Sequence, residues 1–197
     1  SHLADDLVLG EEAHPAAVAA VVAVVAHDEV LVRAQRECGL GYREMALKGI
    51  STFTPKTDDF GLAVAIFRAL DNWVHPFSGS VDIGPDDSYE RPRPVDELVA
   101  EGASPFVGTA PGLKLKPWAL PLEYLPPLFQ EAFQWSLFDD DPSRRLAPGQ
   151  WERLLGDYLD QLVDCPCGHA YHRGFSACPY CHVEAEMAKA TPVVEAA

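Results

Sequence analysis

The chain has 197 residues, 48% of them hydrophobic, which is enough for one domain with a sizeable core and a small appended module. Thirty acidic residues against 15 basic ones give a formal net charge of −15, which opposes binding to nucleic acid or to an anionic membrane surface. The longest apolar run, Ala16 to Ala26, is too short to span a bilayer. We therefore expect a globular protein whose partner is neither nucleic acid nor a membrane.

Residues 1–40 favour no single structure, because their alanines suit a helix and their valines suit a buried strand equally well. From Thr57 the pattern is clearer. Thr57 is a good N-cap, Asp58 and Asp59 fit the positive end of a helix dipole, and the residues from Phe60 to Leu70 are apolar on nearly every side. These features predict a central buried helix that ends before the proline of His75-Pro76.

Prolines and glycines divide the following part of the chain. A polar loop is expected over 78–92, a short helix from Val95 to Glu101 that Gly102 terminates, and an irregular segment over 103–121. Pro126-Pro127 begins a further helix with a wide apolar face, which ends at an Asp-Asp-Asp-Pro run. The last helix is expected to begin near Pro148, with these residues on one face: Trp151, Leu154, Leu155, Tyr158, Leu159 and Leu162.

Four of the five cysteines and three of the seven histidines fall in the short stretch from Cys165 to His182. Such a cluster of soft ligands is typical of a tetrahedral zinc site. A site with four protein ligands leaves no open position for catalysis, so we expect a structural zinc ion. Five residues compete for the four positions, and His172 and His182 are expected to lie outside them. The candidate ligands are Cys165, Cys167, His169, Cys178 and Cys181.

Several motifs, in their order along the chain, resemble the C-terminal lobe of bacterial eukaryotic-like Ser/Thr protein kinases that end in a cysteine-rich module. The segment Thr57-Asp-Asp-Phe-Gly-Leu-Ala-Val-Ala-Ile-Phe67 is similar to the buried central helix of that lobe, and His75-Pro-Phe77 to the motif that follows it. The segment Asp141-Pro-Ser-Arg-Arg145-Leu-Ala-Pro148 resembles the region before the family's last helix. His169-Ala-Tyr and Cys178-Pro-Tyr-Cys181 are similar to its tail.

The resemblance implies roles for individual residues. Asp58 would be the aspartate that caps the backbone of the catalytic loop, and Arg145 the arginine that pairs with the glutamate of an Ala-Pro-Glu motif. The counterpart of that glutamate is Glu44, in Arg43-Glu-Met-Ala46. The family spacing favours His169 as the nitrogen ligand of zinc, with Cys178, Cys181 and either Cys165 or Cys167.

The family transfers phosphate from ATP to Ser or Thr of proteins, with Mg²⁺ as cofactor, but the chain lacks the motifs for that chemistry. It has no glycine-rich loop, no strand lysine and no catalytic-loop aspartate with its asparagine. Whether it is an enzyme therefore stays open, and we expect this chain alone to be inactive. Two hypotheses follow: the distal part of a longer kinase-like protein with a protein substrate, or a non-catalytic scaffold or zinc-ribbon module that binds a protein partner.

Taken together, the sequence predicts a mainly α protein with a kinase C-lobe-like helical domain and a small zinc-ribbon-like module. The expected divisions are an uncertain segment 1–40, the helical domain 41–163, the zinc module 164–183 and a disordered tail 184–197. Cysteines gathered in a metal-type cluster, with only Cys38 outside it, favour a reducing cytoplasm over a disulfide scaffold.

Overall fold

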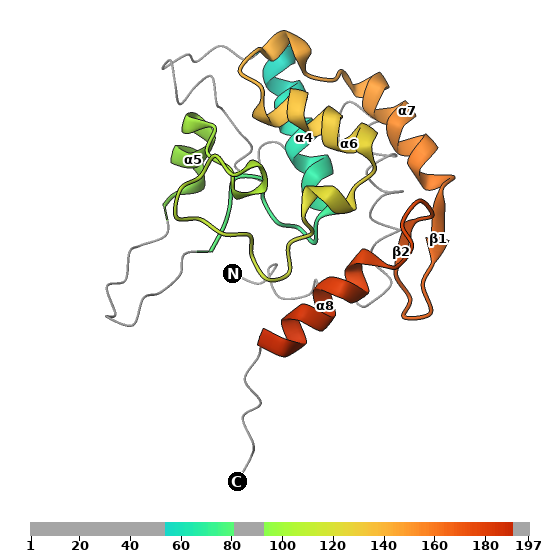
Figure 1. Cartoon of the computed structure of the whole chain (residues 1–197). Coiled ribbons are helices and arrows are strands. Elements are labelled where there is room, and N and C mark those ends of the chain that lie inside the picture. Colours follow the sequence, from blue (N-terminus) through green and yellow to red (C-terminus); the bar gives the residue numbers. More distant parts are fainter. Residues whose placement is uncertain (1–53, 81–92, 191–197) are drawn as a thin grey trace, which may run out of the picture.

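The computed structural model describes residues 54–80 and 93–190 (Figure 1). The expectations for residues 1–40, Cys38 and Glu44 lie outside these ranges. Over the described residues the chain is mainly helical, as predicted. The helices and strands are α4 (Pro55–Leu70), α5 (Val95–Glu101), α6 (Pro127–Phe133), a π-helical turn (Gln134–Phe138), α7 (Pro148–Leu159), β1 (Leu162–Asp164), β2 (Ala170–His172) and α8 (Pro179–Ala190).

Helix α4 is the central element, and it begins three residues earlier than expected. Its N-cap is Thr54, whose side chain accepts a hydrogen bond from the backbone of Thr57, while the Thr57 hydroxyl binds back to the Thr54 N–H. Pro55 fits the first helical position because it needs no hydrogen-bond partner there. The prediction of Thr57 as the N-cap was therefore wrong. Asp58 lies exposed in the first turn, and Asp59 is the buried carboxylate of the pair.

The other elements enclose α4. In Figure 1, α4 passes behind α6, with α7 beside it. The ring of Phe67 on α4 meets Phe106 and Phe133 edge-on, at centroid distances of 4.8 and 5.0 Å. Phe133 in turn packs 5.2 Å from Trp151 of α7, which is fully buried. These aromatic contacts explain why α4 is apolar on nearly every side, as a helix in the centre of a domain must be.

The helices and loops begin and end where the prolines and glycines predicted, with two exceptions. Helix α5 has the expected bounds, and Gly102 ends it in the left-handed conformation at φ 66°. Helix α7 ends at Leu159, so Leu162, which was placed on its apolar face, instead begins β1. The prediction of a disordered tail from residue 184 is also wrong for residues 184–190, because they continue α8. Residues 191–197 lie outside the described part.

A buried carboxylate joins the end of α4 to the irregular segment that follows α5. Asp71 is 1% exposed, and its Oδ1 accepts a hydrogen bond from the backbone N–H of Leu120 at 2.5 Å. Its other oxygen has no hydrogen-bond partner among the described residues. Burial raises the pKa of Asp71 to about 7, and the hydrogen bond from Leu120 only partly opposes this effect.

Asp71→Asn is expected to stabilise the protein at pH 8 and to have little effect at pH 4. The raised pKa of Asp71 in the folded state means that the wild type loses stability as the pH rises from about 4 to 7, because the folded state must ionise a buried carboxyl. Asparagine keeps the acceptor for Leu120 and carries no charge. At about 1.4 kcal/mol per pKa unit, the gain at pH 8 should be roughly 2–4 kcal/mol. Urea unfolding at both pH values measures it, and an equal effect at both would contradict the assignment.

Candidate metal centre

A tight hairpin holds the first two candidate ligands. Strands β1 and β2 pair antiparallel, with Leu162 opposite His172 and Asp164 opposite Ala170. The turn between the strands is closed by the N–H of Cys165, which donates to the carbonyl of His169 at 2.7 Å, and by the N–H of Gly168, which donates to the carbonyl of Cys165 at 2.9 Å. Gly168 has φ 91°, a conformation that favours glycine.

The start of α8 brings two more ligands to the hairpin. Cys178 directly precedes the helix, and Cys181 lies in its first turn. The Sγ atoms of Cys165 and Cys181 are 3.4 Å apart, and Nδ1 of His169 lies 3.4 Å from Sγ of Cys181 and 3.7 Å from Sγ of Cys178. All four donor atoms lie within 4.8 Å of one another. Zinc bonds of about 2.0–2.3 Å in a tetrahedron place ligand atoms about 3.5–3.8 Å apart, so a zinc ion fits this group.

The structure brings together four of the five predicted ligands. Cys167 is exposed and lies outside the group, so Cys165 is the better candidate for the position that sequence reasoning left open between them. His172 is stacked on Tyr158 in parallel planes, with its Nε2 3.0 Å from Oε1 of Gln161. His182 is exposed, and its ring meets that of Tyr124. Neither histidine belongs to the group.

Neighbouring groups shift the pKa values of two of the thiols in opposite directions. The backbone N–H of Cys167 lowers the pKa of the Cys165 thiol, which favours the thiolate. The hydrogen bond with Cys165 raises the pKa of the Cys181 thiol, because it holds the proton on Cys181. Binding of a divalent cation would have to displace that proton.

One further residue of the site was missed by sequence reasoning. Nε2 of His169 lies 3.1 Å from Oε1 of Glu184, so a carboxylate orients the imidazole with Nδ1 toward the cysteines. Such a carboxylate–histidine pair is common around bound zinc. Glu184 lies three residues after Cys181, and this spacing on a helix was the available signal, but the segment was expected to be disordered.

The metal module, which we define as β1, β2 and α8, is packed against the end of α4. Tyr180 of α8 is 6% exposed, and its hydroxyl donates to the carbonyl of Leu70 at 3.3 Å. The Tyr180 ring also lies 5.6 Å from the ring of His169. Arg173 donates to the carbonyl of Asp160, at the end of α7. The module is therefore joined to the helical domain on two sides.

Tyr180→Phe is expected to lower the free energy of unfolding by about 1 kcal/mol, because the ring stays packed while the carbonyl of Leu70 loses a buried donor. Urea unfolding measures this loss. Tyr171→Phe in β2, where the tyrosine is only partly buried, serves as the control and should change stability by less than about 0.5 kcal/mol. Equal effects of the two substitutions would contradict the anchoring role of Tyr180.

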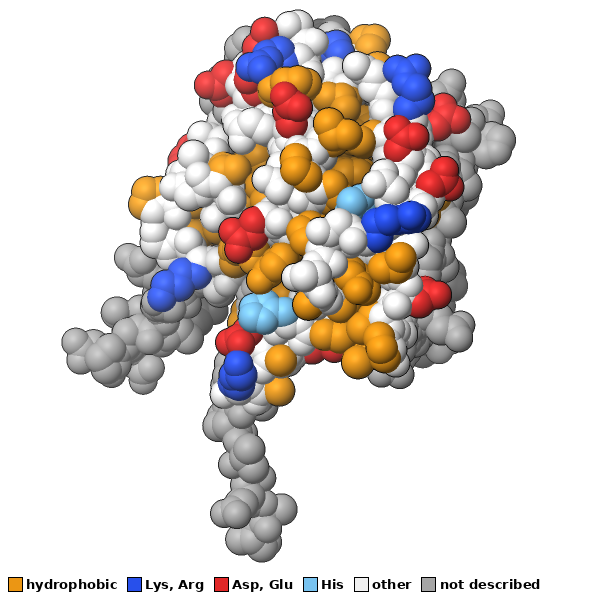
Figure 2. Space-filling view, turned by 45° about the vertical axis from the view of Figure 1, so that its right-hand side comes forward, with side chains coloured by type: hydrophobic (Ala, Val, Ile, Leu, Met, Phe, Trp, Pro, Cys, Tyr) orange, Lys and Arg blue, Asp and Glu red, His pale blue; other side chains and the backbone are white. Residues whose placement is uncertain are grey.

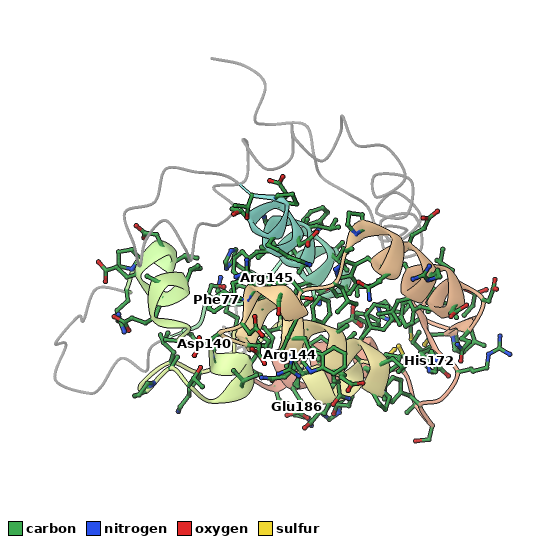
Figure 3. All side chains as sticks on the ribbon, turned by 90° about the horizontal axis from the view of Figure 1, so that it is seen from above. Phe77, Asp140, Arg144, Arg145, His172 and Glu186 are labelled. Carbon is green, nitrogen blue, oxygen red and sulfur yellow. The ribbon has the colours of Figure 1, made fainter. Side chains whose placement is uncertain are left out.

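Of the residues assigned by the family resemblance, Asp58 lies in the first turn of α4 and Arg145 packs against it, while Glu44 lies outside the described residues. Arg145 is 4% exposed and donates from Nη1 to the carbonyl of Lys56 at 2.7 Å, while Nζ of Lys56 donates to the carbonyl of Arg145 at 2.9 Å. The Arg145 guanidinium also lies 5.0 Å above the ring of Phe60. Figure 3 shows Arg145 beside α4 and His172 at the side of the hairpin. Asp58, which is exposed, makes no contact of this kind within residues 54–80 and 93–190.

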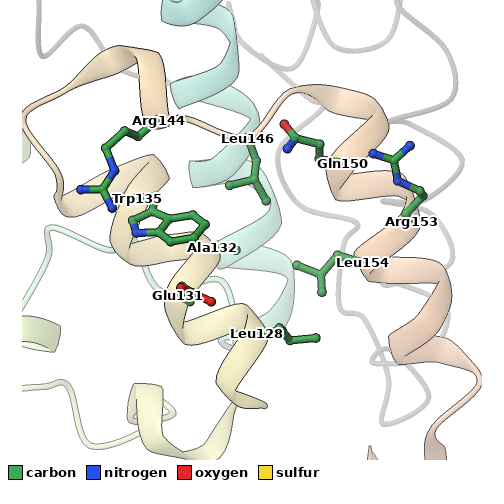
Figure 4. A pocket seen from close by; sticks show the side chains of 9 residues that line it. All are labelled: Leu128, Glu131, Ala132, Trp135, Arg144, Leu146, Gln150, Arg153 and Leu154. Carbon is green, nitrogen blue, oxygen red and sulfur yellow. The ribbon is translucent and has the colours of Figure 1, made fainter.

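A groove of about 340 Å³ opens between α6 and α7 (Figure 4). Its apolar side chains include Leu128, Trp135, Leu146 and Leu154. Arg144 lies on one side of this apolar strip and Arg153 on the other. Figure 2 shows hydrophobic side chains gathered in a band over the middle of one face, with charged side chains along its edges.

Comparison with known proteins gave no match among protein-family models, curated proteins or solved structures. Among the described residues, no helix is long and apolar enough to cross a membrane. The site must therefore be interpreted from its own geometry.

Proposed function

We propose that the chain is the C-lobe-like portion of a Ser/Thr protein kinase-like protein, stapled by a structural zinc ion, and that it binds a protein partner without transferring phosphate itself. The observation that carries this proposal is the group formed by Cys165, His169, Cys178 and Cys181. These four protein ligands complete a tetrahedron and leave no position for a substrate or a reactive water. A zinc-ribbon-like staple fits this group better than a catalytic centre.

The arrangement around α4 supports the kinase-like part of the proposal. The resemblance rests on the helical segment 57–67, on the His-Pro-Phe motif after it and on the segment around Arg145. Arg145 is buried against the start of α4, where it donates to the carbonyl of Lys56. The expected partner of Arg145, Glu44, lies outside the described residues.

Exposed hydrophobic residues support partner binding. Trp73 and Trp118, which lie side by side after α4, are 56% and 44% exposed. Large apolar side chains left on a surface are typical of protein interfaces when they gather in patches. Thiol ligands kept reduced for zinc also fit a cytoplasmic protein.

The absence of phosphoryl transfer is tested by calorimetric titration of the purified chain with Mg-ATP. We expect no saturable binding, because the sequence has no glycine-rich loop, strand lysine or magnesium-binding motif. Saturable binding in the micromolar range would contradict the proposal. In the parent DNA, an in-frame kinase N-lobe upstream would identify the chain as the distal part of a longer kinase-like protein.

A further inference from the structure

A second surface, at the C-terminal end of α4, carries two exposed tryptophans with a cation over each. The guanidinium of Arg68 lies 5.8 Å from the centre of the Trp73 ring, and the ammonium of Lys116 lies 5.8 Å from that of Trp118. We call the four residues Arg68, Trp73, Lys116 and Trp118 the tryptophan surface. None of them belongs to the metal centre or to the groove between α6 and α7.

The backbone holds Trp73 outward in an unfavourable conformation. Asn72 and Trp73 have φ values of 41° and 61°, in the left-handed region that a bulky side chain rarely adopts. The N–H of Trp73 donates to the carbonyl of Arg68 at 2.8 Å, and the amide of Asn72 donates to the carbonyl of Trp118 at 3.0 Å. The hydrogen bond to Arg68 ends α4, and left-handed residues are common at such helix ends, but glycine or asparagine usually occupies them rather than a bulky tryptophan that is mostly exposed. Strain of this kind is concentrated at functional sites.

Among the described residues, neither cation has an acidic partner, although acidic residues outnumber basic ones two to one in the chain. Within residues 54–80 and 93–190, no ion pair is formed by Arg68 or Lys116, and the buried Nε of Arg68 has no hydrogen-bond partner. Both cations lie close enough to His75 to help burial lower its pKa, to about 4, so this neighbour stays neutral at pH 7. The tryptophan surface is thus locally positive and aromatic.

We propose that the tryptophan surface binds an acidic peptide segment of a partner protein, with carboxylates paired to Arg68 and Lys116 and apolar side chains packed on the two indoles. This inference rests on the proposed function of partner binding and names the class of partner. Trp and Arg dominate the energetics of protein interfaces, and two cations that form no ion pair within the part of the chain that the structure describes favour a ligand that carries carboxylates. A basic peptide would instead be repelled at this surface.

The test is selection of random 12-residue peptides displayed on phage against the purified, zinc-loaded chain, followed by affinity measurement of the enriched peptides. We expect acidic peptides to be enriched, and their binding to weaken as salt is added. Trp73→Gly and Lys116→Glu should each weaken binding about tenfold or more. Trp73→Gly also removes the left-handed strain, so the melting temperature should be maintained while binding is lost.

Leu128→Ala, in the groove between α6 and α7, is the matched control and should leave binding unchanged. Enriched peptides that are not acidic, or that bind Trp73→Gly and Lys116→Glu as tightly as the wild type, would overturn the inference and leave the proposed function standing. Binding lost in Leu128→Ala alone would likewise overturn it, because the partner would then occupy the groove. Failure to enrich any peptide would contradict partner binding itself.

Discussion

Replacing Cys178 with serine is expected to abolish stoichiometric zinc binding and to unfold the metal module. The Cys178 thiol is buried between the hairpin and α8, where it faces Nδ1 of His169. Structural zinc contributes about 10–16 kcal/mol to the folding of small zinc domains, and loss of one thiolate removes much of that contribution. We expect a fall in melting temperature of about 10 °C or more. Metal analysis and thermal unfolding followed by circular dichroism measure both effects.

Cys167→Ser is the matched control, since it removes a thiol two residues from Cys165 that is exposed and outside the group. It should keep one zinc ion per chain and change stability by less than about 0.5 kcal/mol. Retention of zinc by Cys178→Ser together with its loss in Cys167→Ser would show that the ligand set is wrong.

The second large effect is expected at Arg145. Arg145→Ala removes a buried guanidinium that donates to the carbonyl of Lys56 and covers the ring of Phe60, so it leaves both a cavity and an unsatisfied acceptor. Such losses cost about 2–4 kcal/mol. Arg145→Lys should recover little of this, because an ammonium lacks the planar fork that stacks on the ring. Urea unfolding at pH 7 measures these differences.

The neighbouring Arg144 provides the control. Its guanidinium pairs with Asp139 and lies 5.3 Å from the ring of Trp135, with 46% of its side chain exposed. An exposed pair of this kind contributes about 0–1 kcal/mol. Comparable losses in Arg144→Ala and Arg145→Ala would contradict a special role for Arg145 at the start of α4.

The helices were predictable where the signal was local. Prolines, Gly102 and the apolar pattern of residues 60–70 mark the helical segments, because they act within a few residues of each other. The N-cap of α4 was misplaced since Thr54 and Thr57 both suit that position, and the choice depends on where Pro55 falls. The burial of Asp71 and the contacts of Arg145 depend on segments far apart in sequence, so no local pattern shows them.

The sequence predicted which residues cluster at the metal centre but not how they are arranged around the ion. Spacing alone could not choose between Cys165 and Cys167, because the choice depends on the turn that pairs Cys165 with His169. Helix α8 was not predicted at all, because it has no strong amphipathic pattern of its own. It is held in place by Cys181 and by the buried ring of Tyr180. The contact between Glu184 and His169 was missed because no helix was predicted there.

The central claim is a closed zinc site with three sulfur ligands and one nitrogen ligand. X-ray absorption at the zinc edge of the purified chain tests it most directly, because it counts the ligands around the ion. The account predicts three sulfur atoms at about 2.3 Å and one nitrogen atom at about 2.0–2.1 Å. Four sulfur atoms would mean that Cys167 replaces His169, and an oxygen ligand from water would mean an open, potentially catalytic site. Either result would contradict the account.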